Sequence, residues 1–270
     1  MKKFMGLCGF LLAALMLLTG VRAYAATDWN SNVITVTGYG IAPPRAVNAA
    51  QARILARIAA KADAQRQLAE AINGVQVDAS TTVEQMMVVS DTINTRVQAT
   101  IKGARIVSEN VTSDGAYEVT MEIPMFGESG GLAEAVFERP VEVLPFPTPE
   151  PVAPSIPQPA VRGGYTGLII DCRGLGLNPV MSPVIKTSSG TKIYGHQNLD
   201  YDMVIRDGMA SYASDMSQAS RAGSNPLVIK AERLDDHNAN PVISVTDGNT
   251  VLMENDSAGF LSRTAVVFLR

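Results

Sequence analysis

The residues with the clearest capacity for chemistry gather around Cys172. A thiol nucleophile needs a base within hydrogen-bond reach, and the two histidines of the chain, His196 and His237, follow in the same half of the sequence. The neighbouring Arg173 could lower the pKa of the thiol. However, Cys172 follows the apolar run 168–170, a setting typical of a small residue packed in a core. The pattern therefore predicts no catalytic residue, and we expect a protein that is not an enzyme.

Two acidic clusters could be considered as metal ligands. Asp235, Asp236 and His237 offer two carboxylates and an imidazole, but they lie among asparagines and a proline that are typical of a solvated turn. The run 247–249 (Asp-Gly-Asn) predicts a hairpin turn, because the series of acidic ligands of a calcium loop is absent. We therefore expect neither a metal nor a cofactor.

A glycine-rich turn follows Cys172 and resembles phosphate-binding turns in outline. The third glycine of a dinucleotide site is missing, and the prolines at 179 and 183 make a poor helix start. Glycines here can simply shape a turn that lets backbone approach closely. Should the chain bind a small ligand, the rim is predicted at Arg173, Gly174, Gly176 and Asn178.

The N-terminus has the pattern of a secretion signal. Lys2 and Lys3 precede an apolar run over 4–18, and small residues at Ala23 and Ala25 suit signal peptidase. The run is shorter than the roughly 20 residues that a membrane-spanning helix needs. We predict a signal peptide over residues 1–25, cleaved between Ala25 and Ala26, and export to the periplasm or cell envelope.

The position of Cys8 does not fit a lipid attachment site. Leu7 precedes it in place of a small residue, and the apolar core follows Cys8 instead of leading up to it. The sequence therefore predicts no lipid anchor. Cleavage would leave Cys172 as the single cysteine, so no intramolecular disulfide can form, and its thiol is either buried or open to intermolecular pairing.

The charge of the mature chain argues against some partners. Three of the 22 basic residues leave with the signal, so 19 remain against 26 acidic ones, a formal charge of −7. No basic block appears along the chain, so we expect binding neither to nucleic acid nor to an anionic membrane by charge. A second long apolar stretch is also missing, which predicts no integral membrane span after signal removal.

A proline-rich segment divides the mature sequence. Residues 140–159 carry a proline at every second or third position, which favours an extended polyproline conformation rising about 3.1 Å per residue. We predict domains at 26–139 and 163–270, joined by a linker at 140–162. Such a spacer would hold its flanking modules roughly tens of ångströms apart.

The first module combines strands with a long helix. A strand is predicted over 33–40, and Pro43 and Pro44 predict the start of an alanine-rich helix that reaches about Ile72. Asn73 and Gly74 suit a left-handed helix cap. The arc predicted to face a sheet comprises Val47, Ala50, Ile54, Ile58, Leu68, Ala69 and Ile72.

The rest of that module is predicted less uniformly. Residues 75–100 are ambiguous, with a shorter helix beginning near Ser90. Strand-like runs at 104–112 and 116–125 then flank a hairpin turn at 113–115, with apolar and polar side chains alternating in the second run. The module is predicted to be a small α+β unit with the helix packed on an antiparallel sheet.

The second module is predicted to mix helices and strands. It has a buried strand over 165–172, a hairpin from 184 to 194, and a helix over 201–220 that Gly208 weakens. Further strands are predicted at 227–231, 242–245 and 264–269. The fold class of the whole chain is α+β, with a mixed α/β second module.

Several linked stretches resemble a known family. ITVTGYG (34–40), AQARILARIAAKADAQRQLAEAINGVQV (50–77) and IKGARIVSENVTSDGAYEVTMEIPMFG (101–127) together resemble the LPP-twenty lipoprotein family, related to the N-terminal domain of flagellar assembly protein T. The stretches GLIIDCRGLGLNPVMSPVI (167–185) and NPLVIKA (225–231) resemble the C-terminal part of longer members.

The resemblance implies a role in the envelope. Members are envelope or surface proteins, many of them lipid-anchored, and the family has no catalytic residues to carry over. We therefore expect a non-catalytic exported cell-envelope protein that works through contacts with other envelope proteins in assembly or maintenance of an envelope or surface structure. The alternative is a periplasmic protein that binds a small ligand through its C-terminal domain, and the sequence leaves a homo-oligomer open.

Overall fold

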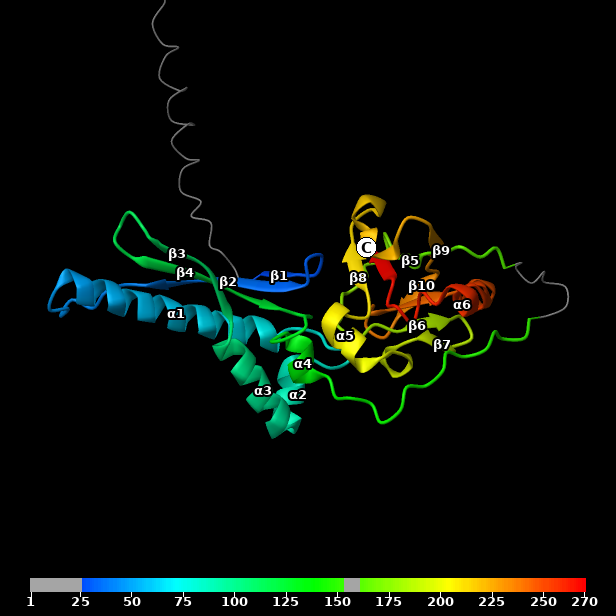
Figure 1. Cartoon of the computed structure of the whole chain (residues 1–270), viewed down its shortest axis with the longest axis horizontal. Coiled ribbons are helices and arrows are strands. Elements are labelled where there is room, and N and C mark those ends of the chain that lie inside the picture. Colours follow the sequence, from blue (N-terminus) through cyan, green and yellow to red (C-terminus); the bar gives the residue numbers. More distant parts are fainter. Residues whose placement is uncertain (1–25, 153–160) are drawn as a thin grey trace, which may run out of the picture.

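The computed structural model describes residues 26–152 and 161–270 and confirms the α+β class with two modules (Figure 1). The predicted signal peptide, Ala25 at its cleavage point, and residues 153–160 of the predicted linker lie outside the described residues. Among the residues described, no helix combines the length and apolarity needed to cross a membrane.

The first module is an antiparallel sheet of four strands in the order β1-β2-β4-β3, with α1 along one face (Figure 1). Its strands are β1 (Ala26–Asp28), β2 (Val33–Gly40), β3 (Arg105–Val111) and β4 (Tyr117–Pro124). Its helices are α1 (Ala49–Asn73), α2 (Val83–Val89), α3 (Asp91–Lys102) and α4 (Leu132–Val136). The predicted hairpin and the helix beginning near Ser90 are confirmed.

Both predicted ends of α1 need correction. The helix begins at Ala49, later than the prolines, because the Asn48 side chain accepts the backbone N–H of Gln51 at 2.9 Å and so caps the helix. At the other end Gly74 has φ −79°, a right-handed conformation, and its N–H donates to the Ile72 carbonyl. The predicted left-handed cap is therefore wrong.

The buried face of α1 also differs from the predicted arc. The helix contacts the sheet through Ala56, Ala60, Ala64, Leu68 and Ile72. Ile54 and Ile58, in the first half of the helix, point to water instead and are 59% and 58% exposed. Val47 lies before the helix and is 84% exposed.

Two glycines of β2 explain this choice of face. A Cβ on Gly38 would lie 2.3 Å from the Ala60 carbonyl oxygen, and one on Gly40 would lie 2.1 Å from that of Ala56. The two backbones touch, so only alanine fits on the helix at this contact. The larger isoleucines are turned outward as a consequence.

Side chains of α1 also cover the free edge of β2. The Asp63 carboxylate accepts the Tyr39 N–H at 3.1 Å, and Gln67 Nε2 donates to the Thr37 carbonyl at 3.0 Å. These contacts satisfy backbone groups beyond the short strand β1, where β2 has no further strand partner. The helix therefore blocks strand addition at this edge.

The second module contains two four-stranded sheets. A parallel sheet has the order β8-β12-β5-β9 and a mixed sheet the order β10-β11-β6-β7. The parallel strands are β5 (Gly167–Asp171), β8 (Ser211–Ala213), β9 (Pro226–Lys230) and β12 (Val266–Leu269). The mixed sheet comprises β6 (Ile185–Thr187), β7 (Lys192–Tyr194), β10 (Arg233–Asp235) and β11 (Asn240–Ile243). The longer helices are α5 (Tyr201–Asp207) and α6 (Val245–Ala258), with short 3-10 turns at His196–Asn198, Met216–Gln218 and Ser220–Ala222.

Two predictions for this module are wrong. The helix predicted over 201–220 ends at Asp207, because Gly208 adopts φ 74° and leads into β8. The run 247–249 lies in the first turn of α6 and not in a hairpin, because the Ser244 hydroxyl oxygen accepts the Asp247 N–H at 3.0 Å and caps the helix.

The proline-rich segment does not separate the modules. Leu144 N–H donates to the Gln197 carbonyl at 2.8 Å, and Glu150 N–H donates to Asn249 Oδ1 at 2.7 Å. Its described part therefore lies along the second module, and the modules contact each other directly. The predicted separation is wrong because proline carbonyls remain good acceptors, as Asn198 Nδ2 shows by donating to the Pro145 carbonyl at 3.0 Å.

The contact of α1 with β2 yields a stability prediction. We expect Gly38→Ala to lower the free energy of unfolding by about 3 kcal/mol or more, because the new methyl group meets backbone atoms that cannot move separately. Gly74→Ala is the matched control, since its nearest neighbour would lie at 3.6 Å and its φ is ordinary. Urea unfolding measures both, and equal effects would contradict the proposed contact.

Candidate functional site

The junction between the modules brings together backbone hydrogen bonds and aromatic pairs. Two backbone hydrogen bonds cross it side by side: Met181 N–H donates to the Gln76 carbonyl at 3.0 Å, and Ser182 N–H donates to the Val77 carbonyl at 2.7 Å. A third joins Gly127 N–H to the Ile205 carbonyl at 3.0 Å. Backbone pairing of this kind fixes the relative position of the modules, because it tolerates little sliding.

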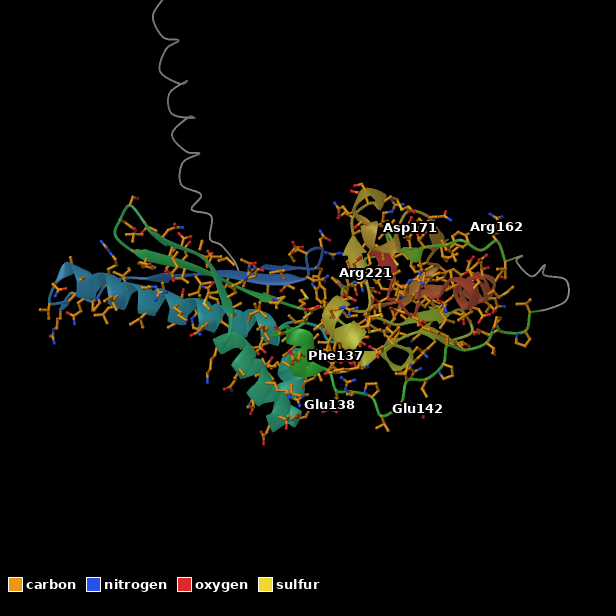
Figure 2. All side chains as sticks on the ribbon, in the orientation of Figure 1. Phe137, Glu138, Glu142, Arg162, Asp171 and Arg221 are labelled. Atoms are coloured by element: carbon orange, nitrogen blue, oxygen red, sulfur yellow. The ribbon has the colours of Figure 1, made fainter. Side chains whose placement is uncertain are left out.

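Aromatic side chains fill the space between these hydrogen bonds. Trp29 meets Tyr212 edge to face at 5.7 Å between ring centroids, and Phe137 stacks on His196 at 5.1 Å. Phe137 lies where the chain leaves the first module (Figure 2). Burial lowers the pKa of His196, so this ring stays neutral over most of the physiological range.

At Gly208, just after α5, the second module contacts Phe126 of the first module. A Cβ at this position would lie 2.9 Å from the Phe126 ring, and the φ of 74° already favours glycine. The sequence indicated only that Gly208 weakens a helix. The neighbouring sequence gives no sign that Gly208 packs against the Phe126 ring, because the two residues lie far apart in the chain.

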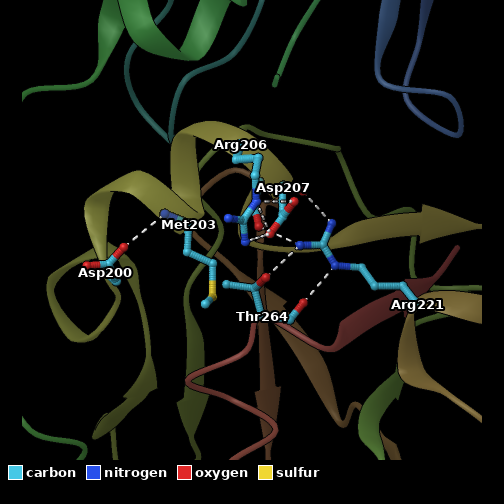
Figure 3. Close-up of polar contacts among 7 residues, drawn as sticks. Asp200, Met203, Arg206, Asp207, Arg221 and Thr264 are labelled. Carbon is cyan, nitrogen blue, oxygen red and sulfur yellow. Dashed lines mark hydrogen bonds and ion pairs between the residues drawn. The ribbon is translucent and has the colours of Figure 1, made fainter. Parts of the chain in front are cut away.

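Arg221 holds this corner of the second module together (Figure 3). Its Nε donates to the Thr264 carbonyl at 2.7 Å, and its Nη1 donates to the Asp207 carbonyl at 2.7 Å. Nη2 donates to the Gly208 carbonyl at 2.5 Å and to Thr264 Oγ1 at 2.8 Å. Burial lowers the pKa of Arg221, yet a guanidinium starts so high that it remains charged. No motif or spacing in the sequence singles out this arginine.

The predicted ligand rim is divided by the structure. Arg173 pairs with Asp171 through Nε–Oδ1 at 2.9 Å and Nη2–Oδ2 at 2.6 Å, so its guanidinium is already occupied. Gly174 and Gly176 adopt φ 81° and 78° with open space around them, which fits a shaped surface turn. Asn178 faces elsewhere, donating through Nδ2 to the His237 carbonyl at 2.9 Å.

Two of the clefts beside the junction include residues that the sequence singled out. One, of about 660 Å³, is lined from both modules and includes Trp29, Gln76, Asn178 and His237. The other, of about 510 Å³, includes Asp78, Lys192 and His196. Of the predicted rim residues Asn178 lines the first cleft, whereas Arg173, Gly174 and Gly176 line neither of these two, so neither cleft brings the four together.

The thiol of Cys172 is placed for packing. It is fully buried, and burial together with the nearby Asp171 carboxylate raises its pKa to about 12. Among the residues that the structure describes, no hydrogen bond joins it to His196 or His237. The thiolate that a nucleophile needs is therefore rare at neutral pH.

The acidic cluster around His237 is engaged internally. Lys186 Nζ donates to Asp236 Oδ2 at 2.5 Å and lies 3.9 Å from Asp235 Oδ2, while Asn240 Nδ2 also donates to Asp236 at 2.7 Å. Asp236 and His237 have φ of 50° and 57°, which suits the predicted turn. Within residues 26–152 and 161–270, no three His, Cys, Asp or Glu side chains form a group that could hold a metal.

The Arg221 network leads to a direct test. Arg221→Lys keeps the charge but loses the fork that reaches three separate carbonyls, so we expect a loss of about 2–4 kcal/mol in the free energy of unfolding. Arg206→Lys is the matched control, because Arg206 pairs only with its neighbour Asp207 on the exposed end of α5. Its unfolding midpoint should stay unchanged. Equal midpoints for the two variants would show that the network is unimportant.

The burial of Cys172 predicts its reactivity. With a pKa of about 12, roughly one thiol in ten thousand is ionised at pH 8, so a thiol reagent should react only as fast as the protein opens. Following absorbance with a disulfide reagent checks this with and without denaturant. Fast reaction of the folded protein would contradict the assignment and reopen cysteine-dependent catalysis.

Comparison with known proteins finds one family model in each module. Residues 37–123 match the model of the LPP20 lipoprotein family. Residues 167–270 match the model of the second domain of Treponema pallidum Tp0624. No curated protein matches the chain. The relation to flagellar assembly protein T stays a prediction. The chain therefore carries an LPP20 lipoprotein domain at residues 37–123, followed by a domain like the second domain of Tp0624.

Proposed function

We propose that this is an exported cell-envelope protein that works without catalysis, as a rigid two-module adaptor that binds other envelope proteins. The LPP20 lipoprotein match and the signal pattern of residues 1–25 support the envelope location. We further propose that it is not lipid-anchored, since Cys8 lies outside the position that a lipid attachment site requires. The raised pKa of the Cys172 thiol supports a non-catalytic role.

The rigidity of the adaptor rests on the shared core. One continuous apolar cluster includes Met125 and Phe137 from the first module and Met209 and Tyr212 from the second. Domains that only touch through a small polar surface move freely, whereas an apolar interface with crossing backbone hydrogen bonds resists such movement. A partner bound to one module is therefore held in a fixed position relative to the other.

The observation that carries the proposal is the end of the α2–α3 pair. These helices project away from both modules' sheets (Figure 1), and α2 ends in Val88 and Val89, which are 81% and 84% exposed. The exposed acidic residues Glu84 and Asp91 lie next to them. An apolar centre with a charged rim is the usual anatomy of a protein-binding surface. We name Val88 and Val89 the valine knob.

Site-specific crosslinking in living cells tests this. A photoreactive amino acid at Val89 should yield a small reproducible set of adducts with envelope proteins. Val228 is the matched control, an exposed valine of β9 in the second module, and should yield none of that set. Val88→Asp with the crosslinker at Val89 should remove the adducts, because a carboxylate disrupts an apolar contact.

Two results would overturn the proposal. One is a protein that forms no adduct from the valine knob although it is exported at normal levels. The other is an identical set of adducts from Val89 and Val228, which would reflect random collision and not a binding surface.

A further inference from the structure

The first half of α1 and the loop before it form a second uncovered surface, which we name the arm face. It comprises Ile41, Arg45, Val47, Arg53, Ile54 and Ile58, all of them exposed. Figure 1 shows that the start of α1 lies beside the β3–β4 turn, at the end of the molecule farthest from the second module. The arm face is therefore separate from the junction and from the valine knob.

The aliphatic side chains of the arm face form a stripe along the helix. Ile54 and Ile58 are one turn apart on α1, and the exposed Val47 lies in the loop just before the helix cap Asn48. The opposite side of the helix is the one that packs on Gly38 and Gly40 through alanines. The stripe consequently points straight away from the sheet, and nothing in the described chain covers it.

A row of cations borders this stripe. Arg53, Arg57 and Lys61 follow each other at four-residue spacing, which places them along one flank of the helix. Arg57 Nη2 pairs with Glu109 Oε1 at 2.6 Å, which shows that this flank faces β3. Arg53 and Arg45 have no ion-pair partner among the described residues.

Acidic residues are missing from the whole stretch. No aspartate or glutamate occurs between Ile41 and Ala62, in a mature chain that carries a formal charge of −7. The four cations are spread over 17 residues, so they form no block in the sequence. The helix and its preceding loop bring them to one end of the molecule. The sequence, which has no basic block, predicted no binding to an anionic membrane by charge, and this grouping is the reason to test that prediction.

The sheet side of the arm has the opposite character. Glu118 and Glu122 of β4 alternate with buried residues and point to the outer face of the sheet, where Glu122 pairs with Arg105. The arm therefore has a cationic, aliphatic helix side and an acidic, polar sheet side. Such a two-sided arrangement orients the arm when it approaches a negatively charged surface.

We propose that the arm face docks on an anionic lipid surface. Aliphatic side chains on a convex helix ridge, bordered by arginines, match a helix that lies in the plane of a bilayer interface with its apolar face among the acyl chains. A second copy of this chain is a poor occupant of the same face, because Arg45 and Arg53 would meet their own counterparts. An acidic protein is the remaining alternative, and it is an outcome of the test.

The contact is expected to be reversible. Each cation near an anionic bilayer strengthens binding about fivefold, and salt screens the attraction beyond roughly 10 Å. Two unpaired arginines and three or four aliphatic side chains give a docking surface that acts together with other contacts of the protein. The inference goes beyond the proposed function, since it concerns another surface and another class of partner.

Vesicle sedimentation tests the proposal with the chain beginning at Ala26. The vesicles contain phosphatidylglycerol mixed with phosphatidylcholine, or phosphatidylcholine alone. We expect binding to the anionic vesicles that falls at least tenfold in 0.5 M NaCl. The variant Arg45→Gln with Arg53→Gln should bind at least tenfold more weakly, and Ile54→Ser with Ile58→Ser should also weaken binding. Val88→Ser with Val89→Ser is the matched control and should bind like the unchanged protein.

The outcomes separate this proposal from the first. All the substituted side chains are exposed, and unchanged circular dichroism and thermal unfolding would confirm that the variants fold. Equal binding to neutral and anionic vesicles, or unchanged binding of the arginine variant, would overturn lipid docking. Absence of vesicle binding together with crosslinking of the arm to an acidic protein would also overturn it. None of these results affects the valine knob.

Discussion

The contact between the backbones of α1 and β2 determines most of what the first module presents to its surroundings. Gly38 and Gly40 remove the side chains that would normally separate a helix from a sheet, so the helix settles on its alanines. That choice places Asp63 and Gln67 over the free edge of β2, where they satisfy the backbone. It also commits Ile54 and Ile58 to the opposite side. An exposed aliphatic stripe is thus the direct consequence of a close contact elsewhere on the same helix.

The junction extends this rigidity to the rest of the chain. Arg221 donates hydrogen bonds to the carbonyls of Asp207 and Gly208 at the end of α5. Because Gly208 has no side chain, the Phe126 ring can pack directly against it. Because the Arg221 donors are already bound to carbonyls, its buried charge is compensated and is not available to a ligand. The described part of the proline-rich segment lies along the second module and is hydrogen-bonded to it. The two modules are therefore joined through a shared apolar core.

The local elements of this fold were predictable because their signals are local. The alternation Tyr117–Ile123 and the turn at 113–115 fix a hairpin without reference to the rest of the chain, and α3 begins near Ser90 as predicted. The face of α1 was not predictable in this way. Hydrophobic periodicity predicts that the isoleucines of α1 are buried, whereas the close contact with β2 admits only small side chains. That contact becomes visible only when the structure places Gly38 and Gly40 opposite the helix.

The candidate sites also differ in whether neighbouring sequence is enough to predict them. Cys172 follows an apolar run, and its burial was foreseen as the ordinary outcome, since a strand interior needs small apolar side chains. Arg173 and Asn178 were grouped because they are near in sequence, but each is held by a different partner, one by Asp171 and the other by the 236–238 turn. Residues that act together at the junction, such as Phe126 and Arg221, are separated by most of a domain and share no motif.

A common feature of the charged side chains around the candidate sites bears on how the protein works. Arg221, Asp236 and Arg173 all direct their donors or acceptors to partners within the chain, and the Cys172 thiol is held in its neutral form. Groups that are satisfied in this way contribute to the fold. Aliphatic side chains that remain exposed to water lie instead at two projecting ends of the molecule, in the valine knob and the arm face. A partner that binds at these ends would bury this apolar surface without any change in the core, as the proposed adaptor role requires.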